Sequence, residues 1–264
     1  MTPMNSAPSQ SPIDFEKYAM ARHGTLQMNT RAMLAAKRTP LAPIPLAKKA
    51  APKPIDRSTY PVVLLTIYGV VWIALAIAPL DRHDWLLENL LPLLALPLLA
   101  YVYRHHAVSR FSYTLIFLFV VLHAIGAHYT YAKVPYDDWF RALSGHSLNA
   151  LLGLQRNGFD RLVHFLYGLL LFPVVWELFA PHIDKRGLRY LLVATFLMSH
   201  AGIYEIIEWL AAAGFGGDLG VAYLGTQGDL WDAQKDMAMA CLGTLLAVLA
   251  RYARERRPTA QIQL

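Results

Sequence analysis

The feature that most constrains this chain is a series of long apolar runs that begins at Tyr60. About 20 apolar residues, rising about 1.5 Å each, cross a hydrocarbon core of roughly 30 Å. Only 16% of the 264 residues are charged, against about a quarter in soluble domains. The sequence therefore predicts an all-α integral membrane bundle of six transmembrane helices. The expected spans are Tyr60–Leu80, Trp85–Tyr103, Phe111–Tyr129, Leu162–Ala180, Leu188–Ala212 and Lys235–Tyr252.

The first 59 residues have a different composition from the rest of the chain. They contain eight of the 16 prolines and nine Lys or Arg, but only three Asp or Glu. We expect a disordered, basic, Pro-rich cytoplasmic tail (residues 1–59), a transmembrane domain (60–253) and a short basic C-terminal tail (254–264). An alternative for Pro12–Arg38 is a weak amphipathic helix lying on anionic lipid.

The orientation follows from Lys and Arg in the short loops, which are enriched on the cytoplasmic side. With the N-terminus inside, eighteen Lys or Arg lie inside and six outside. We expect a multi-pass protein of a bacterial inner (cytoplasmic) membrane, with both termini cytoplasmic and Gly214–Gly228 periplasmic. The net charge of +6 is then a positive-inside signature, so the partner is the lipid bilayer and not nucleic acid.

Acidic residues are concentrated at the expected outer face, where twelve of the 18 Asp and Glu lie. The positive-inside rule does not require this asymmetry. Several of these acids recur at helical spacing on one face of an expected span. They are Asp160 with His164 (i, i+4), Glu205 with Glu208 (i, i+3), and Asp229, Asp232 and Asp236 (i, i+3, i+7).

Ionisable groups inside a membrane are costly and mark a functional site by default. Neighbouring carboxylates repel, so some must hold a proton, pair with a base or bind a cation. We therefore expect one cluster near the outer interface, with a divalent cation as the candidate cofactor, whose identity stays open. The expected catalytic residues are His164, Glu205 and Glu208. The expected metal ligands are Asp160, His164, Glu208, Asp232 and Asp236.

Structural interpretations stand beside this one. Asp160, Asp229 and Asp232 could simply cap helices, where the helix dipole favours anions. His123 and His128 lie 140° apart on a helix and are not expected to share a ligand, and His200 is equally a core histidine. The Gly-rich stretch Gly214–Gly228 is interpreted as a flexible loop, or alternatively as a lid over the carboxylates.

Six blocks of the sequence carry a resemblance to a known family. They are DRHDWLLEN (Asp81–Asn89), SYTLIF (Ser112–Phe117), LHAIGAHYTYAKVPYDDWF (Leu122–Phe140), RNGFDRLVHFLYGLLL (Arg156–Leu171), YEIIEW (Tyr204–Trp209) and FGGDLGVAYLGTQGDLWDAQKDMAMACLG (Phe215–Gly243). They resemble the YjdF family of bacterial inner-membrane proteins, a family of unknown function. The resemblance implies a helical inner-membrane protein and brings no established catalytic residues.

A fainter resemblance joins Asp160 and His164 with Glu208 and the Asp232–Asp236 segment. This set resembles the core of VanZ-like proteins, which are associated with glycopeptide (teicoplanin) tolerance. The Gln and Arg usually found between that glutamate and the last helix are missing here.

Three functions stay open at this point. The first is a metal-assisted or acid–base enzyme acting on a lipid-linked or envelope substrate at the periplasmic face. The second is an ion-coupled transporter using the same carboxylates, and the third is a non-catalytic envelope protein whose polar cluster holds helices together. A carrier should need polar groups through the membrane, and the inner half is nearly bare of them, which favours the first and third. Substrate and oligomeric state are not determined by the sequence.

Overall fold

The computed structural model describes residues 59–256, apart from the side chains at positions 218, 219, 221 and 222. Within that range every regular element is a helix, as the apolar runs predict. The expected tails fall outside the described residues, except for Thr59, which precedes α2, and positions 254–256, which continue the last helix. The helices are α2 (Tyr60–Leu75), α3 (Arg82–His105), α4 (Arg110–His128), α5 (Tyr136–Ser144), α6 (Leu148–Leu152), α7 (Phe159–Phe179), α8 (Arg186–Phe215), α9 (Gly217–Leu224) and α10 (Asp232–Arg256).

Five of these helices, α3, α4, α7, α8 and α10, are long and apolar enough to cross a membrane. The expected first span is shorter than predicted, because α2 has 16 residues and ends at Leu75 instead of Leu80. At 1.5 Å per residue it is about 24 Å long. The chain leaves the helix before Pro79, with Ala78 at φ 48°, since a residue preceding proline is disfavoured in the helical region.

Local chemistry explains where the neighbouring helices begin. The Asp81 carboxylate accepts hydrogen bonds from the backbone N–H groups of His83 and Asp84 at the start of α3. Ser109 does the same for α4 by accepting from Ser112 N–H. Pro92 and Pro97 lie inside α3 without ending it, which membrane helices tolerate when neighbours satisfy the freed carbonyls.

The closest packing in the described part of the chain is between α7 and α10. A Cβ at Gly168 of α7 would collide with the Ala240 carbonyl oxygen, and one at Gly243 of α10 with the Phe165 carbonyl oxygen. The two backbones therefore touch through reciprocal glycines, as small residues allow in membrane helix pairs. Helix α8 completes this group, and a core with Phe172, Val193 and Leu197 fills the space between the three helices.

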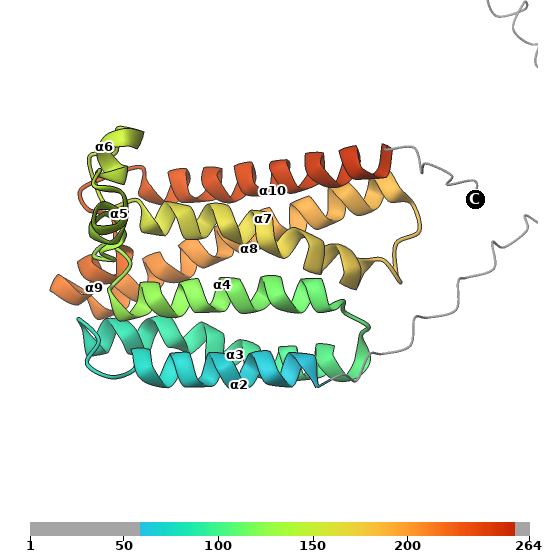
Figure 1. Cartoon of the computed structure of the whole chain (residues 1–264), viewed down its shortest axis with the longest axis horizontal. Helices are drawn as coiled ribbons and strands as arrows, with labels where there is room; N and C mark the ends of the chain where they lie inside the picture. Colours follow the sequence, from blue (N-terminus) through green and yellow to red (C-terminus); the bar gives the residue numbers. More distant parts are fainter. Residues whose placement is uncertain (1–58, 257–264) are drawn as a thin grey trace, which may run out of the picture. The chain divides into compact units, whose positions relative to one another are not determined.

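Helix α4 joins this group to α2 and α3, since it packs on α7, α2 and α3 (Figure 1). Two histidines of α4 each bond to a backbone carbonyl of a neighbour. His123 Nε2 lies 3.0 Å from the Glu88 carbonyl of α3, and His128 Nδ1 lies 2.7 Å from the Leu75 carbonyl of α2. These hydrogen bonds therefore tie α4 to α3 and to α2.

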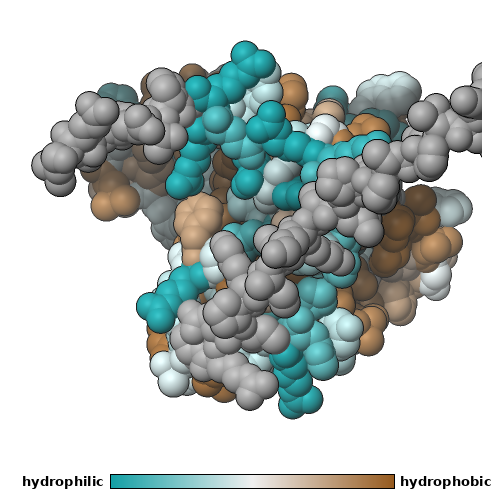
Figure 2. Space-filling model, turned by 90° about the vertical axis from the view of Figure 1, so that its right-hand side faces the viewer, coloured by the Kyte–Doolittle hydropathy of each residue, from teal (hydrophilic) through white to brown (hydrophobic). Residues whose placement is uncertain are grey.

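The two ends of the bundle differ in charge. One end carries the N-terminus of α2 and the C-terminus of α10, and hydrophilic side chains gather on it (Figure 2). Exposed bases there include Arg104, Arg186 and Arg254. Large apolar residues such as Leu94 and Leu249 are exposed along the sides of the long helices, as expected for a surface that faces lipid.

The opposite end holds α5, α6 and α9 (Figure 1). Here the interpretation of Gly214–Gly228 as a flexible loop needs correction, because α9 (Gly217–Leu224) forms within it and packs on α8 and α3. Tyr223 of α9 is buried. Burial of this aromatic ring supplies the packing that the glycine content of the segment did not suggest.

Candidate functional site

Buried ionisable side chains gather at the end of the bundle that holds α5, α6 and α9. They come from the first turns of α3, α7 and α10, the second half of α8 and the last turns of α4. All are less than a tenth exposed except Asp160, whose side chain is 14% exposed. The set is Asp84, Glu88, His123, Asp160, His164, Glu205, Glu208, Asp232 and Asp236.

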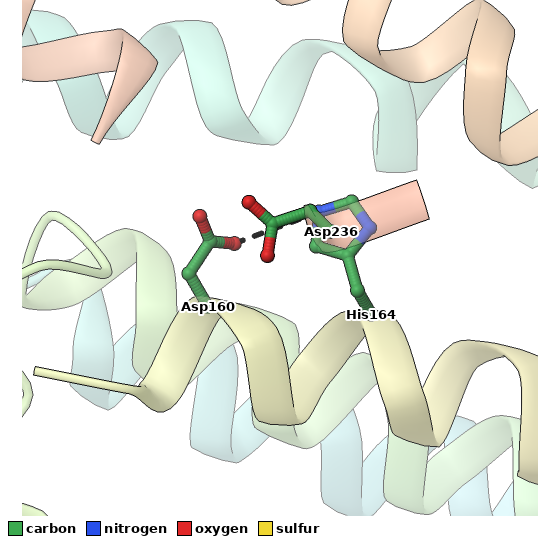
Figure 3. A group of neighbouring side chains, drawn as sticks. All are labelled: Asp160, His164 and Asp236. Carbon is green, nitrogen blue, oxygen red and sulfur yellow. Dashed lines mark ion pairs between the residues drawn. The ribbon is translucent and has the colours of Figure 1, made fainter. Parts of the chain in front are cut away.

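The centre of the set is formed by Asp160, His164 and Asp236 (Figure 3). One potential ligand atom from each residue lies within 4.8 Å of the other two. Asp160 and His164 are one turn apart on α7, with His164 Nε2 3.6 Å from Asp160 Oδ1. The close contact of α7 with α10 places Asp236 opposite them. The structure thus brings together three of the five predicted metal ligands.

Asp160 is not the cap of α7, contrary to the structural interpretation of this residue. The N-cap position belongs to Gly158, which has no capping side chain. Asp160 sits inside the first turn, where an anion is still favoured by the helix dipole. Its carboxylate approaches the imidazole of the following turn.

The predicted catalytic glutamates approach the same histidine from α8. Glu205 Oε1 lies 3.5 Å from His164 Nε2, and this oxygen has no hydrogen bond among the described residues. Glu205 and Glu208 also line a groove of about 600 Å³ between α8 and α10, together with Asp232 and Asp236. The remaining lining is mainly apolar. The groove therefore combines four carboxylates with an otherwise apolar wall.

Asp232 has a different environment from the central trio. Its Oδ1 lies 2.7 Å from Arg156 Nη1 and 3.2 Å from Arg161 Nη2. Asp229, in the loop before α10, pairs with Arg161 at 2.5 Å and with Lys235 at 2.6 Å. Arg156 and Arg161 both form ion pairs with Asp232. The role of Asp232 as a metal ligand stays a prediction.

The bases therefore pair selectively. Arg156 and Arg161 are close to Asp232, and no Lys or Arg ion pair to Asp160, Glu205 or Asp236 occurs within residues 59–256. Asp236 is 2% exposed, and its Oδ1 accepts no hydrogen bond from the described residues. A buried carboxylate oxygen without a partner is costly, so these groups need a proton, a cation or a bound water.

Asp229 lies outside the spanning helices. The Lys235 ammonium, with the Trp231 backbone N–H and the Arg161 guanidinium, holds the pKa of the Asp229 carboxyl well below its usual value. Asp229 thus stays ionised and fixes the entry to α10.

Two buried acids on α3 belong to this region and were not among the predicted site residues. Asp84 is 1% exposed with both oxygens unpaired among the described residues, and Glu88 is 4% exposed. The Tyr204 hydroxyl donates to Glu88 Oε2 at 3.4 Å. Asp84 and Glu88 are spaced i, i+4 at the start of a span, as Asp160 and His164 are. The same sequence pattern could therefore have identified them as site residues.

His200 is not the satisfied core histidine that one interpretation expected. It is exposed on α8, with its ring stacked on Tyr167 at 5.6 Å between ring centroids. It lies deeper along α8 than Glu205 and outside the central trio.

The segment around Gly225–Gly228 is held to the start of α7. Asn157 N–H donates to Gln227 Oε1, and Gln227 Nε2 donates back to the Asn157 carbonyl, both at 3.1 Å. Arg156 donates to the Thr226 carbonyl at 2.6 Å. The segment therefore lies beside the cluster, and its role as a lid stays a prediction.

Comparison with known proteins identifies the family. A family model described as "Predicted membrane protein (DUF2238)" matches residues 60–257. The chain belongs to this family. It is 36% identical to "Inner membrane protein YjdF" of Escherichia coli (strain K12) over 205 residues, which cover 75% of this chain and 94% of that protein. No solved structure matches.

The match confirms the resemblance to YjdF proteins and the assignment as a multi-pass membrane protein related to an inner-membrane protein. The fainter likeness to VanZ-like proteins stays a prediction. The matched range begins at Tyr60, so residues 1–59 lie outside the matched range.

Proposed function

We propose that this chain is a membrane enzyme in which a divalent cation, bound by Asp160, His164 and Asp236, assists reaction of an envelope or lipid-linked substrate. The observation that carries the proposal is the convergence of one imidazole and two carboxylates within 4.8 Å. Two further facts support it. First, Asp236 Oδ1 and Glu205 Oε1 lack hydrogen bonds within the described range. Second, the nearby arginines form ion pairs with Asp229 and Asp232.

The donor set suits this chemistry. Imidazole with carboxylates is a common combination for zinc and manganese, and three protein ligands leave positions open for water or substrate. A cation so held lowers the pKa of bound water or polarises a substrate oxygen. Glu205, beside His164 but outside the trio, is then the candidate general base, with Glu208 next to it on the groove.

The structural alternative rests on the ion pairs of Arg156 and Arg161 with Asp232 and Asp229, which link the start of α7 to that of α10. The contact of α7 with α10 already has its own basis, however, in Gly168 and Gly243. Asp160 and Asp236 are acids on facing helices, so without a proton or cation they repel across this contact. This favours a binding role for the trio over a purely cohesive one.

The metal hypothesis is tested by thermal stability of the purified full chain with zinc, manganese, magnesium or calcium, and with a chelator. A cation that binds only the folded state at about 100 times its Kd stabilises by about 2.7 kcal/mol. We expect at least one cation to raise the wild-type midpoint and Asp236→Asn to abolish the response. Asp138→Asn is the matched control, because Asp138 is 76% exposed on α5.

If the wild type responds to none of these cations and to no chelator, the metal site is refuted. Reaction is tested separately, by incubating the cation-loaded chain with an envelope lipid extract and following the products by mass spectrometry. Products that form with wild type and Asp138→Asn but not with Asp236→Asn support an enzyme. Cation binding without any product would reduce the proposal to a structural metal site.

A further inference from the structure

A second cavity, distinct from the α8–α10 groove, also borders the cluster. Its volume is about 800 Å³, and residues of α2, α3, α4, α7 and α8 line it. Asp160 and His164 form part of its wall, together with Tyr204. The same imidazole and carboxylate therefore border a large space inside the bundle.

The middle of this cavity is apolar and long. Its lining on α3 runs from Leu91 to Arg104, which is about 20 Å of helix. Leu64, Leu99, Phe117 and Leu171 are among the apolar residues between the two ends. Polar side chains occur at both ends, with His164 and Tyr204 at one and Arg104 at the other, and the rings of Tyr68, Tyr167 and His200 also line the mainly apolar wall. The cavity thus has the dimensions and polarity of a site for an extended hydrocarbon chain.

The cavity also communicates with the side of the bundle. Three of its lining residues, Leu65, Leu96 and Ile203, are 55%, 41% and 53% exposed. Helix α3 packs chiefly on α4 and α9, and α8 on α7, α9 and α10. In a membrane protein these sides face the hydrocarbon of the bilayer, so the chains of membrane lipids lie at that opening.

We propose that this cavity holds the hydrocarbon tail of a membrane lipid and presents that lipid's polar group to His164 and Asp160. This rests on the proposed function and narrows its substrate class to amphipathic lipids with at least one long chain. The charge pattern fits an anionic polar group bridged by the cation, because carboxylates alone would repel it. A tail of about 20 Å occupies the apolar section while its polar group reaches the trio.

Two adjacent leucines on α3 give a matched test. Leu99 lines the cavity, whereas Leu98 is 62% exposed on the outer face. We expect native mass spectrometry of the chain in mild detergent to show one bound lipid on the wild type. Leu99→Trp fills the space of about two methylene groups of the tail and should weaken retention about tenfold, while Leu98→Trp should keep it. Equal retention by the two variants, or none by the wild type, overturns the proposal.

A measurement on the wild type guards against a Leu99 variant that fails to fold. A phospholipid with a photoreactive group in its acyl chain is crosslinked to the full chain in vesicles, and the labelled peptides are mapped. We expect labelling of the cavity-lining residues Leu91, Leu99 and Phe117 above that of the exposed residues Leu98, Leu245 and Leu249. Label confined to the exposed residues overturns the proposal.

The two proposals can fail independently. Asp236→Asn removes the expected cation response but leaves the cavity lining intact, so it should retain the lipid. A chain that binds lipid without responding to cations supports the tail cavity and refutes the metal site. A chain that responds to cations but retains no lipid supports the metal site and refutes the tail cavity.

Discussion

At the scale of single residues, the cluster separates into two chemical environments. Asp229 and Asp232 are paired with Arg156, Arg161 and Lys235. Asp160, Glu205 and Asp236 face one another and His164 without such bases in the described structure. Paired acids stay ionised and hold the fold, whereas unpaired buried acids are available for a proton or a cation.

The lowered pKa of Asp229 makes its contribution to stability depend on pH. A carboxyl whose pKa is lower folded than unfolded stabilises the protein above the unfolded value, about 3.9, and loses this as pH falls towards the folded value. We expect Asp229→Asn to lower the thermal midpoint between pH 5 and 7, and the difference from wild type to narrow below about pH 4. Thermal scans of both chains from pH 3 to 7 measure it. A constant difference over that range would show that the charge of Asp229 is not responsible.

At the scale of elements, the pair α7 and α10 sets the geometry of the site. Gly168 and Gly243 bring the two backbones together, which places Asp236 beside Asp160 and His164. The depth of the cluster therefore depends on a helix contact made about one to two turns away. Without that contact the helical spacing of the acids would not produce a shared site.

Substitution at this contact should lower the stability of the bundle. Gly243→Ala puts a methyl group against the Phe165 carbonyl and should destabilise the chain by about 1–3 kcal/mol. Gly69→Ala in α2 is the matched control, since a Cβ there meets nothing within 4 Å. It should be neutral or slightly stabilising, because alanine favours helix. The thermal unfolding midpoints of the two variants are compared. Equal midpoints would mean that α7 and α10 can separate at little cost in free energy.

At the scale of the whole molecule, the described chain is a membrane bundle with a basic end and an acidic end. Exposed Arg104, Arg186 and Arg254 lie at one end, and the carboxylate cluster lies at the other. The orientation of these ends relative to the cytoplasm stays a prediction. Because basic loops are retained in the cytoplasm, the cluster should open towards the periplasm.

Reporter fusions test that orientation. A cytoplasmic reporter attached after Leu264 should be active, and a periplasmic reporter inserted after Gly214 should be active as well. The exchanged reporters at the same positions serve as controls. A periplasmic C-terminus would reverse the bundle and place the cluster on the cytoplasmic side.

The sequence by itself determined the helical spans, because a run of about 20 apolar residues has few other stable states in lipid. It also determined which acids share a helix face, since Asp160 and His164 are one turn apart by spacing alone. It did not predict the early end of α2 at Leu75, which precedes Pro79. It also did not predict helix α9, which is stabilised by the burial of Tyr223.

Only the tertiary structure decided how the faces meet. Asp232 turns to Arg156 while Asp236 turns to His164, although both lie on one stripe of α10. Glu88 joins the region through Tyr204 of α8, a residue distant in sequence. The rotation and depth of each helix are set by its contacts with the others, above all at Gly168 and Gly243. Those contacts depend on the positions of backbone atoms in two helices at once, which the spacing within either helix does not encode.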